Sequence, residues 1–125
     1  MERLTTTITT DGDGAATAYV EPTQPGYIRG IRYVKAGSEN YSDGVQAVIT
    51  GERSGIEILT WAAMNATGTK CPQMATHSIV AAAENYNDEG DEAVNAPIPF
   101  AGERIKIVLS SGGATKTGTF HIWIG

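Results

Sequence analysis

Apolar and polar residues alternate along several short runs of this sequence, and no other feature constrains its fold more. Arg104–Leu109 and Thr119–Ile124 each place an apolar residue at every second position. A period of two is what a β-strand with one buried and one exposed face requires. Ser110–Gly118, between the two runs, is polar and rich in glycine. The sequence therefore predicts that the two runs form an antiparallel hairpin at the C-terminal end.

A second hairpin is expected near the middle of the chain. Val45–Thr50 and Ile56–Trp61 are apolar runs of strand length, and they flank the polar segment Gly51–Gly55. Five residues bounded by glycines are typical of a longer hairpin turn.

Further strands are expected elsewhere, and Gly30 is expected to mark a bulge or a crowded point in one of them. The prolines of Asn95–Phe100 keep that segment extended, whereas Thr76–Ala82 is consistent with a strand or a short helix. The other predicted strands are Leu4–Thr10, Ala16–Glu21 and Tyr27–Val34.

Composition agrees with a β-rich fold. Threonine and glycine each occur fifteen times, whereas leucine occurs three times, which is typical of strands and turns rather than of helical cores. Seven or eight short strands with turns roughly every ten residues predict an antiparallel β-sandwich. We expect an all-β, jelly-roll-like single domain over residues 1–125, with residues 1–10 as an N-terminal arm or edge strand.

The charge balance excludes several classes of partner. Fourteen acidic residues outnumber nine basic ones, giving a net charge of −5, so we expect no general binding of nucleic acid. No stretch approaches the ~20 apolar residues of a membrane span, and no apolar signal segment follows Met1. The single cysteine, Cys71, agrees with a reducing compartment. These features predict synthesis and folding in a cytoplasm.

Two acidic segments resemble cation sites in composition. Asp11–Gly14 opens like an EF-hand calcium loop, but Pro22 stands where the twelfth-position glutamate would be, so a turn between strands is expected. In the segment 85–92 we expect the acidic side chains to lie in water; a role in meeting a basic partner ranks above cation binding, which the sequence leaves open. These residues are Asp88, Glu89, Asp91 and Glu92.

No recognised catalytic signature joins the few reactive side chains. His77 and His121 are the only histidines and Cys71 is the only thiol, and none of them stands in a local motif for nucleophilic or metal chemistry. We therefore expect no enzymatic activity, no cofactor and no metal. Tyrosine and tryptophan are enriched at protein interfaces, so we rank an interface role for the aromatic residues first, ordinary packing second and a sugar-binding platform third.

The C-terminal segment Ala101–Gly125 resembles the closing hairpin of small virion proteins of tailed bacteriophages, the head decoration or cement proteins. This resemblance covers about a fifth of the chain. It implies a non-enzymatic structural protein that binds the major capsid protein and stabilises the shell, commonly as a trimer. Its expected location is the capsid surface of the virion, after synthesis in the host cytoplasm.

The expected contact residues follow from this interpretation. They are the N-terminal residues and two aromatic residues taken to be exposed: Arg3, Leu4, Thr5, Thr6, Tyr41 and Trp123. Deletion of residues 1–10 is expected to abolish capsid binding and to leave the isolated fold largely intact. The alternative functions are a tail or head–tail connector component and a carbohydrate- or receptor-binding module; an enzyme ranks last.

Overall fold

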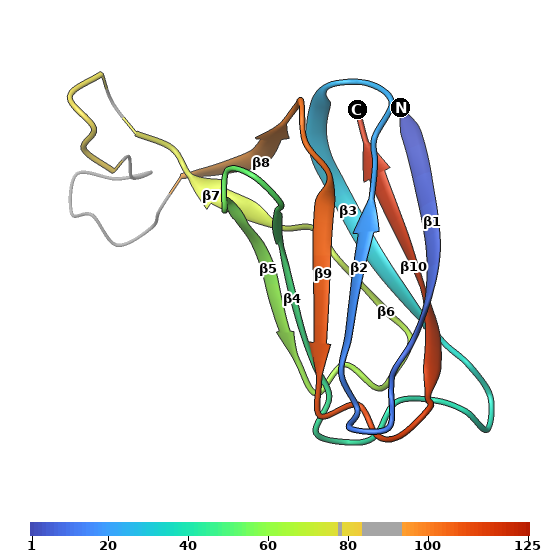
Figure 1. Ribbon diagram of the computed structural model, residues 1–125. Coiled ribbons are helices and arrows are strands. Elements are labelled where there is room, and N and C mark those ends of the chain that lie inside the picture. Colours follow the sequence, from blue (N-terminus) through green and yellow to red (C-terminus); the bar gives the residue numbers. More distant parts are fainter. Residues whose placement is uncertain (78, 84–93) are drawn as a thin grey trace.

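The computed structural model describes residues 1–77, 79–83 and 94–125, and this part of the chain contains strands and no helix (Figure 1). Six strands form one antiparallel sheet. Five of them lie in the order β1 (Glu2–Thr9), β10 (Thr117–Ile124), β3 (Gly26–Lys35), β8 (Asn95–Phe100) and β7 (Gln73–Ala75), and β6 (Gly68–Lys70) also pairs with β3. The second sheet has the order β2 (Ala16–Val20), β9 (Ile105–Ser110), β4 (Gln46–Gly51) and β5 (Glu57–Ala62).

The chain passes repeatedly from one sheet to the other. Strands β1, β3, β8 and β10 belong to the first sheet, and β2, β4, β5 and β9 belong to the second. This alternation is the connectivity of a jelly roll, so the predicted all-β sandwich is confirmed. Ten strands form rather than seven or eight, because β6 and β7 have only three residues each and are too short to show a period of two.

The predicted C-terminal hairpin is wrong. Both of its strands exist, but β9 pairs with β2 and β4, whereas β10 pairs with β1 and β3 in the other sheet. The glycine-rich segment between them therefore crosses from sheet to sheet. Alternation of apolar and polar residues indicates that each strand has one buried face. It does not distinguish strands that pair in one sheet from strands that face one another across the core.

The other hairpin and the irregularity at Gly30 are confirmed. Strands β4 and β5 pair antiparallel around the turn that begins at Gly51. In the first sheet Trp123 pairs with Gly30, but the following residue, Ile124, pairs with Ile28. Arg29 is thus an extra residue on β3, which is the definition of a β-bulge.

Side chains from the inner faces of both sheets form one core. Tyr33 and Phe120 are its largest fully buried members, and isoleucines supply much of the rest. Gly118 also points inward from β10, where it makes room for two aromatic rings. A Cβ atom on Gly118 would lie 2.5 Å from Cε1 of Tyr33 and 2.8 Å from Cε2 of Tyr41, so only glycine fits there without a shift of the rings.

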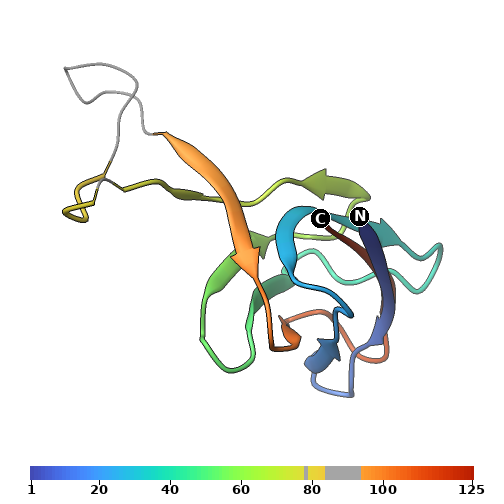
Figure 2. The ribbon, with the colours of Figure 1, turned by 90° about the horizontal axis from the view of Figure 1, so that it is seen from above.

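The β7–β8 pair joins the six-stranded sheet only through Ile98–Phe100 of β8, and the rest of the pair projects away from the sandwich (Figures 1 and 2). The expectation of a strand or short helix over Thr76–Ala82 is wrong for the described positions. Strand β7 ends at Ala75, and His77 makes only an isolated bridge with Ala83. The acidic segment 85–92 lies outside the described residues, and no described helix has the length and apolar character to cross a membrane.

Candidate docking surface

Strand β1 is an edge strand of the six-stranded sheet. Its whole length pairs with β10, from Glu2 opposite Ile124 to Thr9 opposite Thr117. Ile8 is buried, as is Thr10, the first residue after the strand. Deletion of residues 1–10 would thus remove a strand together with part of the core, and it does not separate binding from folding.

The other side of β1 has no strand partner among the described residues. The register continues past β1 to Thr10, whose amide donates to the Lys116 carbonyl at 2.8 Å. In an antiparallel pair, hydrogen-bonded and non-hydrogen-bonded positions alternate. The even-numbered residues therefore direct their backbone groups to β10, and Arg3, Thr5, Thr7 and Thr9 direct theirs to the open edge.

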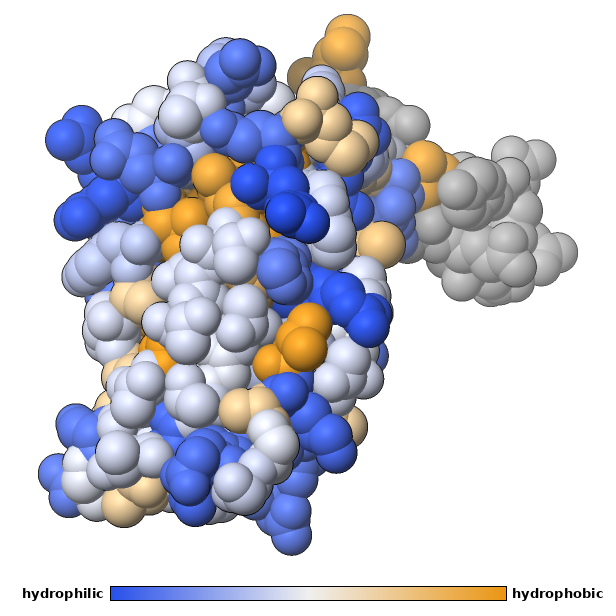
Figure 3. All heavy atoms as spheres, turned by 90° about the vertical axis from the view of Figure 1, so that its right-hand side faces the viewer, coloured by the Kyte–Doolittle hydropathy of each residue, from blue (hydrophilic) through white to orange (hydrophobic). Residues whose placement is uncertain are grey.

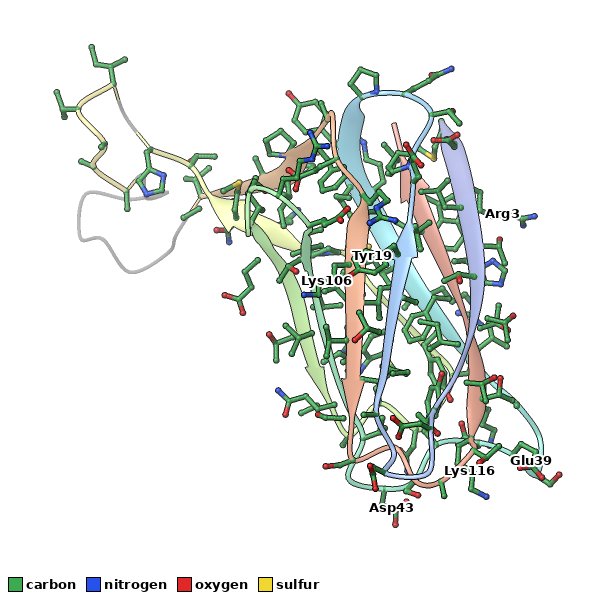
Figure 4. The ribbon with its side chains drawn as sticks, in the orientation of Figure 1. Arg3, Tyr19, Glu39, Asp43, Lys106 and Lys116 are labelled. Atoms are coloured by element: carbon green, nitrogen blue, oxygen red, sulfur yellow. The ribbon has the colours of Figure 1, made fainter. Side chains whose placement is uncertain are left out.

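The predicted N-terminal contact residues lie on two different faces. Arg3 and Thr5 are exposed on the outer face, and Arg3 extends away from β1 in Figure 4. Leu4 and Thr6 are half-buried and alternate with them, so they point toward the space between the two sheets. Leu4 packs there against the core, as do Ala16 and Ala18 of β2.

Figure 3 views the molecule from the side along which β1 lies. Weakly polar side chains cover the middle of this side, and an apolar patch lies above them. A neighbouring strand added at the open edge of β1 would cover both backbone groups and apolar atoms.

The expectation that Tyr41 is exposed is wrong. Its side chain is 3% exposed and stacks on Tyr33 with ring centroids 5.6 Å apart. Its hydroxyl donates to the carbonyl of Ile8 at 2.6 Å. Burial raises the pKa of Tyr41 above its usual value. A loop residue has no strand period that reveals its direction, but the inward-facing Gly118 signals a space that an aromatic ring must fill.

Threonine pairs run across β1 and β10 on the outer face. Thr7 Oγ1 lies 3.2 Å from Thr119 Oγ1, and Thr9 Oγ1 donates to Thr117 Oγ1 at 3.3 Å. Thr5 Oγ1 lies 3.1 Å from Nδ1 of His121. Such pairs belong to the non-hydrogen-bonded positions, where facing side chains come closest.

Trp123 interrupts the threonine rows. It pairs with Arg3 on one side and with Gly30 on the other. A Cβ atom on Gly30 would lie 3.6 Å from Cε3 of Trp123, so the indole leans over the glycine. The indole remains half-buried and its ring is tilted by 31° to that of His121, with centroids 6.3 Å apart. Of the two predicted aromatic contacts, Trp123 alone lies on the surface.

Charged residues line a separate hollow of about 520 Å³ beside the β4–β5 turn. Arg104 donates to both carboxylate oxygens of Glu52, at 2.5 and 2.6 Å. This contact lowers the pKa of Glu52 and raises that of Arg104. Glu103 accepts hydrogen bonds from the amides of Arg53 and Ser54. The hydrogen bonds from Ser54 are the main reason that the pKa of Glu103 is lowered. The sequence did not predict this cluster, whose members pair with one another and hold the turn.

The structure does not bring the other predicted ligand or reactive side chains together into a site. Asp11 forms the predicted turn, accepting from the amides of Asp13 at 2.8 Å and Ala15 at 3.1 Å, and these bonds lower its pKa. Cys71 is exposed, and within the described ranges no three His, Cys, Asp or Glu side chains gather in a way that could hold a metal. Comparisons with protein-family models, curated proteins and solved structures gave no match to this chain.

Proposed function

We propose that this chain is a structural protein of a bacteriophage virion that decorates the capsid and stabilises it by binding the major capsid protein. The open edge of β1 is the observation that carries the proposal. Exposed edges of this length invite pairing with another chain, and proteins usually protect them with charges, prolines or bulges. Within the paired strand β1, Arg3 is the only charged residue on the outer face, and the strand contains no proline.

The edge offers a specific way of binding. An extended segment of the capsid protein can add to the six-stranded sheet next to β1 through main-chain hydrogen bonds. Leu4, Ala16 and Ala18, beside the edge, would contact the apolar side chains of that segment. Because the strand is already ordered in the free protein, little conformational entropy is lost on docking.

Mass action explains how such binding stabilises a shell. A protein that binds the assembled lattice and not its separated subunits shifts the equilibrium toward the lattice. The binding free energies of many copies, each with a modest interface, then add together to stabilise the shell. We propose a trimer of this chain, because contacts between unlike surfaces close into a ring when the rotation allows it.

A pair of substitutions at Thr7 tests the edge. Thr7→Pro removes an outward amide that β10 does not use, whereas Thr7→Val keeps the amide and removes only the hydroxyl. We expect Thr7→Pro to weaken binding to empty heads assembled without this chain by about tenfold or more, the equivalent of about 1.4 kcal/mol. Thr7→Val should bind as the wild type does. Co-sedimentation measures occupancy, and native mass spectrometry gives the number of copies.

Thermal unfolding shows whether each variant is folded. If Thr7→Pro does not fold, Thr5→Pro repeats the test at the preceding outward amide. Full occupancy by a folded proline variant would refute docking through β1. Failure of the wild type to bind heads would refute the capsid role, and binding confined to the tail axis would replace it with a tail or connector role.

A further inference from the structure

The outer face of the six-stranded sheet carries positive charge without a balancing carboxylate. Glu2 is the only acidic residue in the six strands of this sheet. It shares the inward parity of Leu4 and Ile8, and its carboxylate is hydrogen-bonded to the amide of Thr23 at 3.0 Å. Arginines, by contrast, stand on the outer side at Arg3, in the bulge at Arg29, and at Arg32.

These arginines retain most of their hydrogen-bonding capacity. Arg29 gives one bond, from Nε to the Gly125 carbonyl at 3.1 Å, and its guanidinium lies over the Tyr27 ring. Arg3 has no ion pair or hydrogen-bond partner within the described part of the chain. Arg32 gives one bond, from Nη1 to Thr69 Oγ1 at 2.8 Å, out of the five N–H donors of a guanidinium. A planar guanidinium matches the two oxygens of a carboxylate better than a point charge does.

Trp123 stands between these arginines. Arg3 pairs with it from β1, and Arg32 pairs with His121, the next outward residue along β10. Neighbouring strands lie about 4.8 Å apart, and outward residues of one strand about 6.8 Å apart. One ligand unit can therefore lie on the indole and reach a guanidinium on either side, with the Thr5 hydroxyl and the His121 ring beside it.

We propose that this face binds an acidic polysaccharide, with a sugar ring on the indole of Trp123 and carboxylates at Arg3 and Arg32. The flat apolar face of a sugar ring stacks on an aromatic ring, and its hydroxyl groups bond to threonine and histidine side chains. The carboxylate supplies the negative charge that would balance the two guanidinium groups. This site does not depend on capsid docking, which uses the backbone edge of β1.

The same features disfavour a nucleic acid. Such binding draws on several phosphate contacts along a basic surface, and it stacks successive bases on several aromatic rings. Beside Trp123, the tryptophan of this face, stand two arginines, Arg3 and Arg32, on a chain of net charge −5. That set fits one or two carboxylated sugar units.

Calorimetric titration with tetragalacturonate tests the proposal on the full chain. We expect saturable 1:1 binding that weakens as salt rises, and binding of the neutral cellotetraose about tenfold weaker or more. Trp123→Ala and Arg32→Gln should each weaken tetragalacturonate binding by about tenfold. Trp123→Phe, which keeps an aromatic surface, should restore most of the affinity that Trp123→Ala loses.

Matched controls come from the other sheet. Tyr19 and Lys106 pair across β2 and β9 on its outer side (Figure 4), and Tyr19→Ala and Lys106→Gln should leave binding unchanged. The proposal fails if tetragalacturonate shows no saturable binding, or if the folded Trp123 and Arg32 variants bind as the wild type does. It fails equally if a dT oligonucleotide of the same charge binds as tightly, because attraction between charges alone would then account for the signal.

Discussion

The two sheets are alike on the inside and different on the outside. Both contribute fully buried isoleucines to the core, such as Ile122 of β10 and Ile107 of β9. Outside, β10 presents threonine, histidine and tryptophan, whereas β4 and β9 present the facing pair Val48 and Val108. The outer face of the four-stranded sheet also carries charges of both signs, at Lys106 and Glu57.

This difference separates what folding requires from what it leaves free. Inward positions must be apolar and must fill the space between the sheets at the density of a packed core. Outward positions in a sheet need only tolerate water and suit a strand. An outer face with one sign of charge and a tryptophan is therefore not explained by folding.

The largest expected effect lies on the inward side of β10. Gly118→Ala places a methyl group 2.5 Å from Cε1 of Tyr33, and we expect it to lower the free energy of unfolding by about 1–3 kcal/mol, as overpacking does. Gly30→Ala is the outward control, since its nearest neighbour would be 3.6 Å away, and we expect it to cost clearly less. Urea unfolding of both variants measures the difference. Equal losses would contradict the distinction between inner and outer faces.

We expect residues of the six-stranded sheet to cause the loss of stability at alkaline pH, and residues beside the four-stranded sheet to cause the loss at acid pH. Burial raises the pKa of Tyr33 to about 12, from a usual value of 10.0. A group whose pKa is raised on folding stabilises below its unfolded pKa, so stability should fall as pH rises from 10 toward 12. Tyr41 acts in the same direction. Tyr33→Phe should flatten this alkaline decline, measured as the urea midpoint against pH.

The acid limb should come from the loops beside the four-stranded sheet. The pKa values of Glu52 and Glu103 are lowered from 4.5 by their contacts with Arg104 and Ser54. Their contribution is present above pH 4.5 and is lost as pH falls below it. Glu103→Gln should reduce the acid decline and leave the alkaline one unchanged. A change in the alkaline limb would show that the two regions are coupled.

The smallest expected effect is an exchange of outer-face residues between the sheets. Thr119→Val and Val48→Thr give each face a residue typical of the other, and both residues are β-branched and suit strands. We expect each change to shift the free energy of unfolding by less than about 0.5 kcal/mol. A larger loss for Thr119→Val would mean that the bond to Thr7 supports the fold.

The sequence predicted the strands better than their partners. The β4–β5 hairpin was predictable because five residues join two apolar runs. The connection from β9 to β10 has the same signature but spans the core, since a period of two does not say which sheet a strand joins. β6 was missed because Gly68–Lys70 has no alternation, and the burial of Tyr41 because its direction depends on a space left by Gly118, far along the chain.

The site was only partly predictable for the same reason. Arg3 and Thr5 were expected at a contact surface, but their neighbours Arg32 and His121 come from strands that only the register brings together. The open edge of β1 likewise depends on which strand lies last in the sheet. Neither the grouping of these side chains nor the edge position of β1 can be predicted from a single segment of the sequence.

The place of β10 between β1 and β3 has a consequence for synthesis. Its residues leave the ribosome after those of β1 and β3, although they lie between these two strands in the six-stranded sheet. Until they emerge, the nascent chain has β1 and β3 without the strand that joins them, and the inner faces of both are open to water. Pairing of β10 with β1 closes a loop of more than a hundred residues. Translation that stops before Thr117 therefore leaves β1 unpaired and β3 without its β10 neighbour, and such exposed strand edges favour aggregation.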